Sequence, residues 1–103
     1  MPGGFERVAT TAEVGAGSMK LVTVNGQQVC LGNAEGSYFA VGNECTHMSG
    51  SLHQGALVDQ VVRCPDHGSE FHVGTGRAVV GPARRSVKVY RVRVEGNDIL
   101  VSP

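Results

Sequence analysis

The sequence lacks an excess of charge and a long apolar run, and each shortage excludes a class of protein. Nine basic and nine acidic residues cancel, which argues against a nucleic-acid binder or a protein held on an anionic membrane, because both usually carry a positive excess. No stretch approaches the ~20 apolar residues that cross a bilayer, and the first residues show no cationic start followed by an apolar run. We therefore expect a soluble, cytoplasmic protein with no nucleic-acid or membrane partner.

Cysteine is also scarce. The three cysteines cannot all pair within one chain, and a reducing compartment disfavours disulfides in any case. With 103 residues and 41% hydrophobic content, the chain has the size of one ordinary domain and can bury one modest core. We expect a single domain over residues 1–103, in which cysteine serves metal binding or packing.

Helical patterns find little support, whereas strand and turn signals recur. Fifteen glycines fall between short apolar runs, which alternate with period two or are rich in valine, as half-buried strands require. Three hairpins are predicted. The first joins strands 19–24 and 28–31 through Asn25-Gly26, a pair typical of type I′ turns. The second joins strand 28–31 to strand 38–41 through a turn over 32–36, and the third joins strands 87–94 and 98–101 through 95–97. These strands indicate an all-β fold, a small antiparallel sandwich or barrel.

Within residues 87–94 the alternation slips. Val87 and Val89 share one face, whereas Val92 and Val94 belong to the other. One apolar face can be kept only if an extra residue is inserted, so we expect a β-bulge or bend near Tyr90-Arg91.

The second half of the chain holds a run of positive charge. Between residues 77 and 93 there are six cations and no acid: Arg77, Arg84, Arg85, Lys88, Arg91 and Arg93. Such a run is typical of a solvated strand face, and it also fits a docking surface for an acidic protein partner. The sequence leaves both interpretations open.

Two cysteine–histidine pairs are the most informative feature of the chain. Cys45 and His47 are separated by one residue, Cys64 and His67 by two, and sixteen residues lie between the pairs. One thiolate and one imidazole from each pair suit zinc or iron. A structural zinc site of the Cys2His2 type uses the same ligands, so the spacing alone leaves the metal undecided.

The residues between the pairs indicate how the pairs are brought together. Leu57-Val58 and Val61-Val62 can form a strand out and a strand back, with Asp59-Gln60 as the turn. We therefore expect two loops side by side, each offering one thiolate and one imidazole.

These motifs carry a family resemblance that covers nearly the whole chain. It rests on C-T-H at 45–47, C-P-D-H-G-S at 64–69, Phe71, Thr75-Gly76, Gly81-Pro82, and the segments 36–41 and 92–96, which together resemble the Rieske iron-sulfur family. The resemblance implies the Rieske fold, with a cluster-binding subdomain of two loops at about residues 43–54 and 64–76. One 2Fe-2S cluster per chain would be held by Cys45 and Cys64 on the inner iron and by His47 and His67 on the outer one.

The resemblance also implies a branch of that family. Membrane-bound respiratory relatives carry an extra cysteine in each loop, joined as a disulfide, and Gly50 and Asp66 stand at those positions here. Phe71 stands where the same relatives have a tyrosine that hydrogen-bonds a ligand sulfur, whereas Ser69 could still donate its hydroxyl to a cluster sulfur. These features are typical of the low-potential ferredoxins.

The implied function is electron transport, not catalysis. The chain resembles the ferredoxin component of a ring-hydroxylating dioxygenase system, which passes electrons from a flavoprotein reductase to a terminal oxygenase. The Rieske-like small subunit of a nitrite reductase is an alternative within the family, and a zinc-stabilised interaction module is an alternative of another class. Cys30, His53 and His72 match no ligand position; we expect Cys30 to be a buried strand thiol and the two histidines to lie at the surface or beside the ligands.

Overall fold

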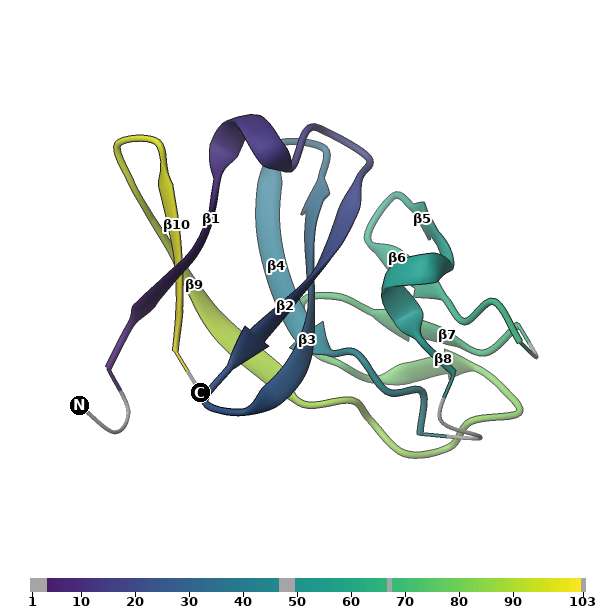
Figure 1. Cartoon of the computed structure of the whole chain (residues 1–103). Coiled ribbons are helices and arrows are strands. Elements are labelled where there is room, and N and C mark those ends of the chain that lie inside the picture. The colour runs from purple at the N-terminus through teal and green to yellow at the C-terminus, as the bar shows by residue number, and fades with distance from the viewer. Residues whose placement is uncertain (1–3, 47–49, 67, 103) are drawn as a thin grey trace.

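The computed structural model describes residues 4–46, 50–66 and 68–102. The described residues form strands and two short 3-10 helices (Figure 1): β1 (Glu6–Thr10), η1 (Thr11–Glu13), β2 (Met19–Val24), β3 (Gln27–Ala34), β4 (Ser37–Gly42), η2 (Leu52–Gln54), β5 (Ala56–Val58), β6 (Val61–Arg63), β7 (Glu70–His72), β8 (Ala78–Val80), β9 (Val89–Glu95) and β10 (Asp98–Ser102). The predicted all-β fold is confirmed. Among these residues, no helix has both the length and the apolar character that crossing a membrane requires.

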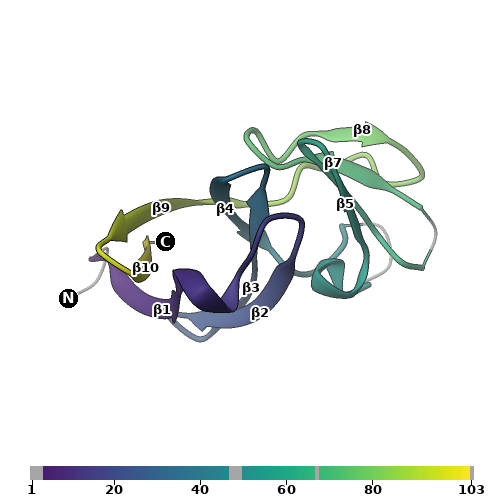
Figure 2. The same ribbon diagram turned by 90° about the horizontal axis from the view of Figure 1, so that it is seen from above.

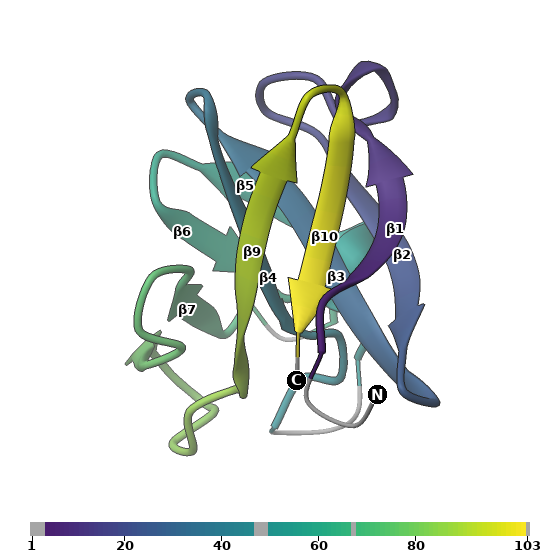
Figure 3. The same cartoon turned by 90° about the vertical axis from the view of Figure 1, so that its left-hand side faces the viewer.

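The larger sheet has six antiparallel strands in the order β1-β10-β9-β4-β3-β2. It curls until its two edge strands, β1 and β2, lie beside each other, so that the sheet nearly closes into a barrel (Figure 3). A core of alternating inward residues fills it, among them Val24, Leu31 and Ile99, which are fully buried.

The smaller sheet has four antiparallel strands in the order β5-β6-β7-β8 and lies beside the barrel, next to the wall formed by β3 and β4 (Figure 2). A second core lies beneath it and contains Cys45 and Cys64 together with Phe71, Leu52 and Val62. The predicted turn at Asp59-Gln60 is confirmed: Val58 pairs with Val61, and Asp59 has φ 55°.

The first two predicted hairpins are present, and the second is tighter than expected. Asn25 and Gly26 have φ of 51° and 81°, as a type I′ turn requires. The turn predicted over residues 32–36 shrinks to Glu35-Gly36, because β3 continues to Ala34, which pairs with Ser37. Gly32 is a strand residue: a Cβ there would lie 2.3 Å from the Phe39 ring, so this glycine makes room for an aromatic ring across the strand pair.

The prediction of a bulge near Tyr90-Arg91 is wrong. The β9–β10 register runs from Glu95↔Asp98 to Arg91↔Ser102 without a shift. Tyr90 takes the inward position on β9, where it is buried, and Val89 faces outward at 40% exposure. The strand changes partner instead of inserting a residue, because Val89 and Tyr90 pair with β4 and the following residues pair with β10.

The third hairpin also starts later than predicted. Val87 precedes β9 rather than belonging to it, and its N–H donates to Gly76 O at 2.8 Å. Its side chain is buried in the core beneath the smaller sheet, not in the barrel. The apparent slip arises because Val87 is buried in this core and Val92 packs against the barrel core, whereas Val89 and Val94 are exposed.

Candidate cluster-binding site

The first loop of the site follows β4 and begins at Cys45. Glu44 and Ser51 form an isolated antiparallel bridge at its base. Above this bridge the Cys45 N–H donates to the Gly50 carbonyl at 2.7 Å. The chain thus turns back within five positions of the cysteine.

The second loop repeats this closure at the end of β6. Arg63 and Glu70 pair at its base, and the Cys64 N–H donates to the Ser69 carbonyl, again at 2.7 Å and five positions later. Gly68, at φ 77°, supplies the left-handed backbone, and its N–H donates to the Cys64 carbonyl at 3.2 Å. Each cysteine is therefore the first residue of a loop closed in the same way.

The two loops touch at Gly50. A Cβ on Gly50 would lie 2.7 Å from Cys64 Sγ and 2.7 Å from Asp66 Oδ2. Any other side chain at this position would push the second loop away, so glycine permits the close approach. The positions at which the sequence resemblance places a loop-to-loop disulfide in other relatives, Gly50 and Asp66, thus lie against each other in this chain.

Both thiols are withdrawn from solvent, with Cys45 3% and Cys64 2% exposed. Burying a thiolate in an apolar core is costly unless a metal binds it. Two buried cysteines on adjacent, equivalently closed loops therefore fit a metal centre. His47 and His67, the other two predicted ligands, lie outside the described residues.

Asn43 braces the start of the first loop, and sequence reasoning missed it. Its N–H donates to Gln28 O at 3.1 Å, its carbonyl accepts the Leu52 N–H at 2.8 Å, and its side-chain Oδ1 accepts the His53 N–H at 2.8 Å. Asn43 Nδ2 is buried without a hydrogen-bond partner in the part of the chain the structure describes. No local pattern marks such a residue, because its partners lie on another strand and ten positions downstream.

The two unassigned histidines are partly buried, His53 beside the first loop and His72 opposite Val61, at the end of β6 away from Cys64. His53 contacts Asn43, with its Nδ1 3.2 Å from Asn43 Oδ1. His72 lies in β7 and its Nδ1 accepts the Gly74 N–H at 3.1 Å. Each therefore has a local hydrogen-bonding partner.

Cys30 is the buried strand thiol that the sequence predicts. It is fully buried in β3, and its Sγ lies 3.6 Å from Met19 Sδ. Burial raises the pKa of the Cys30 thiol to about 12.

At pH 9 we expect iodoacetamide to alkylate Cys30 at least ~20-fold more slowly in the folded protein than in urea. The raised pKa leaves a much smaller fraction of Cys30 as thiolate, and this loss outweighs the greater nucleophilicity of a thiolate of high pKa. The rate should rise about tenfold per pH unit between pH 9 and 11, following the thiolate fraction. Mass spectrometry of the Cys30 peptide measures both quantities. Alkylation as fast as in urea would contradict the burial of this thiol.

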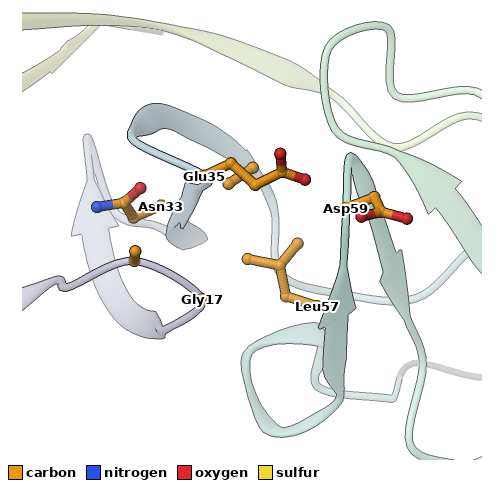
Figure 4. A pocket seen from close by; sticks show the side chains of 7 residues that line it. Gly17, Asn33, Glu35, Leu57 and Asp59 are labelled. Atoms are coloured by element: carbon orange, nitrogen blue, oxygen red, sulfur yellow. The ribbon is translucent and has the colours of Figure 1, made fainter.

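A separate cleft lies between the sheets at the other end of the β5–β6 hairpin (Figure 4). Asn33 and Glu35 line it from the β3–β4 hairpin, and Leu57 and Asp59 line it from the β5–β6 hairpin. None of its lining residues is a cysteine or histidine. The cleft is therefore distinct from the candidate metal centre, which lies beyond the opposite end of β6.

Comparisons with known proteins agree with this geometry. Residues 5–91 match the family model described as the Rieske [2Fe-2S] domain. The biphenyl dioxygenase ferredoxin subunit of Pseudomonas sp. (strain KKS102) is 37% identical over 98 residues, which cover 94% of this chain and 90% of the relative.

Solved structures give the same result. The ferredoxin of carbazole 1,9a-dioxygenase from Nocardioides aromaticivorans IC177 superposes with a TM-score of 0.92 at 32% identity, covering 96% of this chain and 97% of that one. A chain in the complex of reduced oxygenase and oxidized ferredoxin in carbazole 1,9a-dioxygenase superposes with a TM-score of 0.89 at 26% identity, covering 95% and 92%. With two buried cysteines on paired loops and matches along nearly its full length, the chain belongs to the Rieske [2Fe-2S] domain family, as a Rieske-type ferredoxin.

Proposed function

We propose that Cys45, His47, Cys64 and His67 hold one 2Fe-2S cluster at the end of the molecule formed by the two loops. The observation that carries this assignment is the matched pair of closures at Cys45 and Cys64, pressed together at Gly50. His47 and His67 fall within the same two loops in the sequence, between each cysteine and the residue that closes its loop. The single domain of residues 1–103, with cluster-binding loops at about 43–54 and 64–76, is part of the proposal.

A cluster with two thiolate and two imidazole ligands takes up and releases one electron at a higher potential than an all-cysteine cluster. The chain's own residues keep this centre dry and rigid. Phe71, Leu52 and Val62 pack on the two cysteines from below, and hydrogen bonds hold the base of each loop. Such a site needs no substrate pocket, and the protein is an electron carrier rather than an enzyme.

The proposed partners are a flavoprotein reductase and a terminal oxygenase. The chain accepts one electron from the reductase and releases one to the oxygenase, and no bond is made or broken. This is supported by the relatives, which are ferredoxin components of dioxygenase systems, and by the carbazole 1,9a-dioxygenase complex of oxygenase and ferredoxin. A cytoplasmic location belongs to the same proposal, because reductases of this class draw on nicotinamide cofactors. The similarity to ferredoxin components favours this function over a nitrite reductase subunit or a zinc module.

Metal analysis tests the proposal. We expect the purified protein to be reddish brown, with two irons and two acid-labile sulfides per chain, and to give on reduction a rhombic electron paramagnetic resonance signal of low average g, since two nitrogens ligate one iron. One zinc per chain and no visible absorbance would identify a structural zinc module instead.

A further inference from the structure

One segment of the chain is attached to both loops of the site. Between β8 and β9, the Ala83 N–H donates to Ser69 Oγ of the second loop at 2.9 Å, in a buried position. The Thr46 hydroxyl of the first loop donates to the Arg85 carbonyl at 2.7 Å. The backbone of Arg84 and Arg85 is therefore fixed beside the two loops, at the end of the molecule that the smaller sheet occupies (Figure 1).

The side chains of Arg84 and Arg85 are exposed, and neither has an ion-pair partner among the residues the structure describes. Three other cations interact with residues close to them in sequence. Arg93 Nε lies 2.8 Å from Glu95 Oε2, Arg63 Nε lies 3.4 Å from Glu70 Oε2, and Lys88 Nζ lies 4.6 Å from the centre of the Tyr90 ring.

The fold separates the run of six cations by position. Arg91 and Arg93 lie on β9, along the barrel wall, and Arg77 follows the turn after β7. Of these six cations, only the adjacent pair Arg84-Arg85 belongs to a segment that is hydrogen-bonded to the described residues of the two closed turns, 45–50 and 64–69. Exposed Glu44 and Asp66 on these loops make no ion pair with the two arginines in the described structure. The positive charge of the pair is therefore not neutralised by a direct ion pair among the described residues.

We propose that Arg84 and Arg85 form a docking ridge for an acidic surface on the protein that exchanges electrons with this chain; the proposal rests on the electron-carrier function above. Charges at the rim of an interface steer encounter and set orientation more than they add affinity. Guanidinium groups suit this role, because each can bind a carboxylate through two parallel hydrogen bonds. Their fixed backbone orients the partner toward the loops, where a short electron path is available.

The experiment follows electron transfer into the cluster-loaded protein in a stopped-flow spectrometer. The donor is reduced plant-type ferredoxin, a strongly acidic protein whose potential lies well below the Rieske range, so that transfer is downhill. For the double variant R84E/R85E we expect the second-order rate constant to fall about 10-fold or more at low ionic strength. The deficit should fade as salt approaches about 1 M, where the Debye length is only ~3 Å.

The matched control is R77E/R91E, which changes the net charge equally at two exposed arginines that have no ion pair in the described structure. Its rate constant should stay within about 2-fold of the wild type, because it leaves the loop-side ridge intact. Equal slowing of both double variants would show that the rate responds to net charge alone, and it would overturn the docking ridge. An unchanged rate constant for R84E/R85E would overturn it as well.

Metal content and midpoint potential, measured on the same samples, separate the two proposals. A wild type without iron would defeat the electron-carrier function itself. A wild type with two irons, together with an R84E/R85E deficit that does not shrink as salt is raised, would defeat the docking ridge alone.

Discussion

Cys64→Ser should yield a colourless protein with fewer than ~0.2 irons per chain, against two in the wild type, and Cys45→Ser should do the same. The structure explains why serine cannot substitute. Each thiol is buried at the start of a loop, and a serine oxygen there is a harder and far less acidic ligand than the soft thiolate that iron–sulfur clusters take. Iron and acid-labile sulfide analysis of freshly purified protein measures the effect.

Cys30→Ser is the matched control for these variants. Cys30 shares the apolar core with the other two cysteines, so the substitution changes the same atom in a similarly buried place. It should retain two irons and two sulfides, because Cys30 lies in β3 and not on a loop. A Cys30 variant without iron, together with a Cys64 variant that keeps it, would show that the ligand assignment is wrong.

Loss of the metal should also loosen the loops. Ligand binding energy is partly folding energy when the site lies on chain segments with few other contacts. Amide hydrogen exchange of the Cys64→Ser protein should therefore be faster at Cys45 and at position 64, whose N–H groups close the loops. Exchange at Leu31 and Ile99, in the barrel core, should be unchanged.

The fold could be predicted where the signal was local. Asn25-Gly26 and Asp59-Gln60 are flanked by apolar runs, and their turns form as expected. The prediction failed where the decisive contact is distant in sequence. Gly32 suggested a turn, but it lies under the Phe39 ring. The valines from 87 to 94 suggested a bulge, but Val87 lies in one core, Val92 packs against the other, and Val89 and Val94 face outward.

In the site, too, local features could be predicted and contacts between distant residues could not. The two cysteine–histidine pairs are short motifs, and their spacing indicated two adjacent loops. The supports of the loops could not be seen, because the Ala83–Ser69 and Thr46–Arg85 hydrogen bonds join residues far apart in the chain. A lone threonine or alanine has no sequence pattern that distinguishes it from any other.

Ser69→Ala should lower the midpoint potential by about 50 mV or more, the equivalent of ~1 kcal/mol for one electron. Ser69 is fully buried at the end of the turn that begins at Cys64, and its side-chain oxygen accepts the Ala83 N–H. The hydroxyl proton is then available to a different acceptor, and donation to a cluster sulfur favours the reduced, more negative state. Protein-film voltammetry measures the shift.

Thr46→Ala is the matched control, since it also removes one loop hydroxyl. The Thr46 proton is already committed to the Arg85 carbonyl, so this variant should stay within about 15 mV of the wild type. An equal fall in both variants would mean that any loss of loop support lowers the potential, and it would contradict the specific role of Ser69. Iron content, measured first, confirms that both variants are fully loaded.

Phe71→Tyr should move the potential the other way. Phe71 is fully buried in the core that contains both Cys45 and Cys64, so an added hydroxyl has no water to bond and must find a protein or cluster acceptor. Donation to a cluster sulfur should raise the potential by a similar ~50 mV. An unchanged potential, with stability lowered by about 1–3 kcal/mol, would contradict this prediction and show that the hydroxyl reaches no sulfur. Because the wild type has the serine hydroxyl and no tyrosine, its potential should lie at about −150 to 0 mV, in the lower half of the Rieske range. A potential in this range suits accepting electrons from a flavoprotein. A measured value near +300 mV would contradict the expectation that only one side-chain hydroxyl, that of Ser69, donates to the cluster, and it would contradict the assignment to the low-potential ferredoxins.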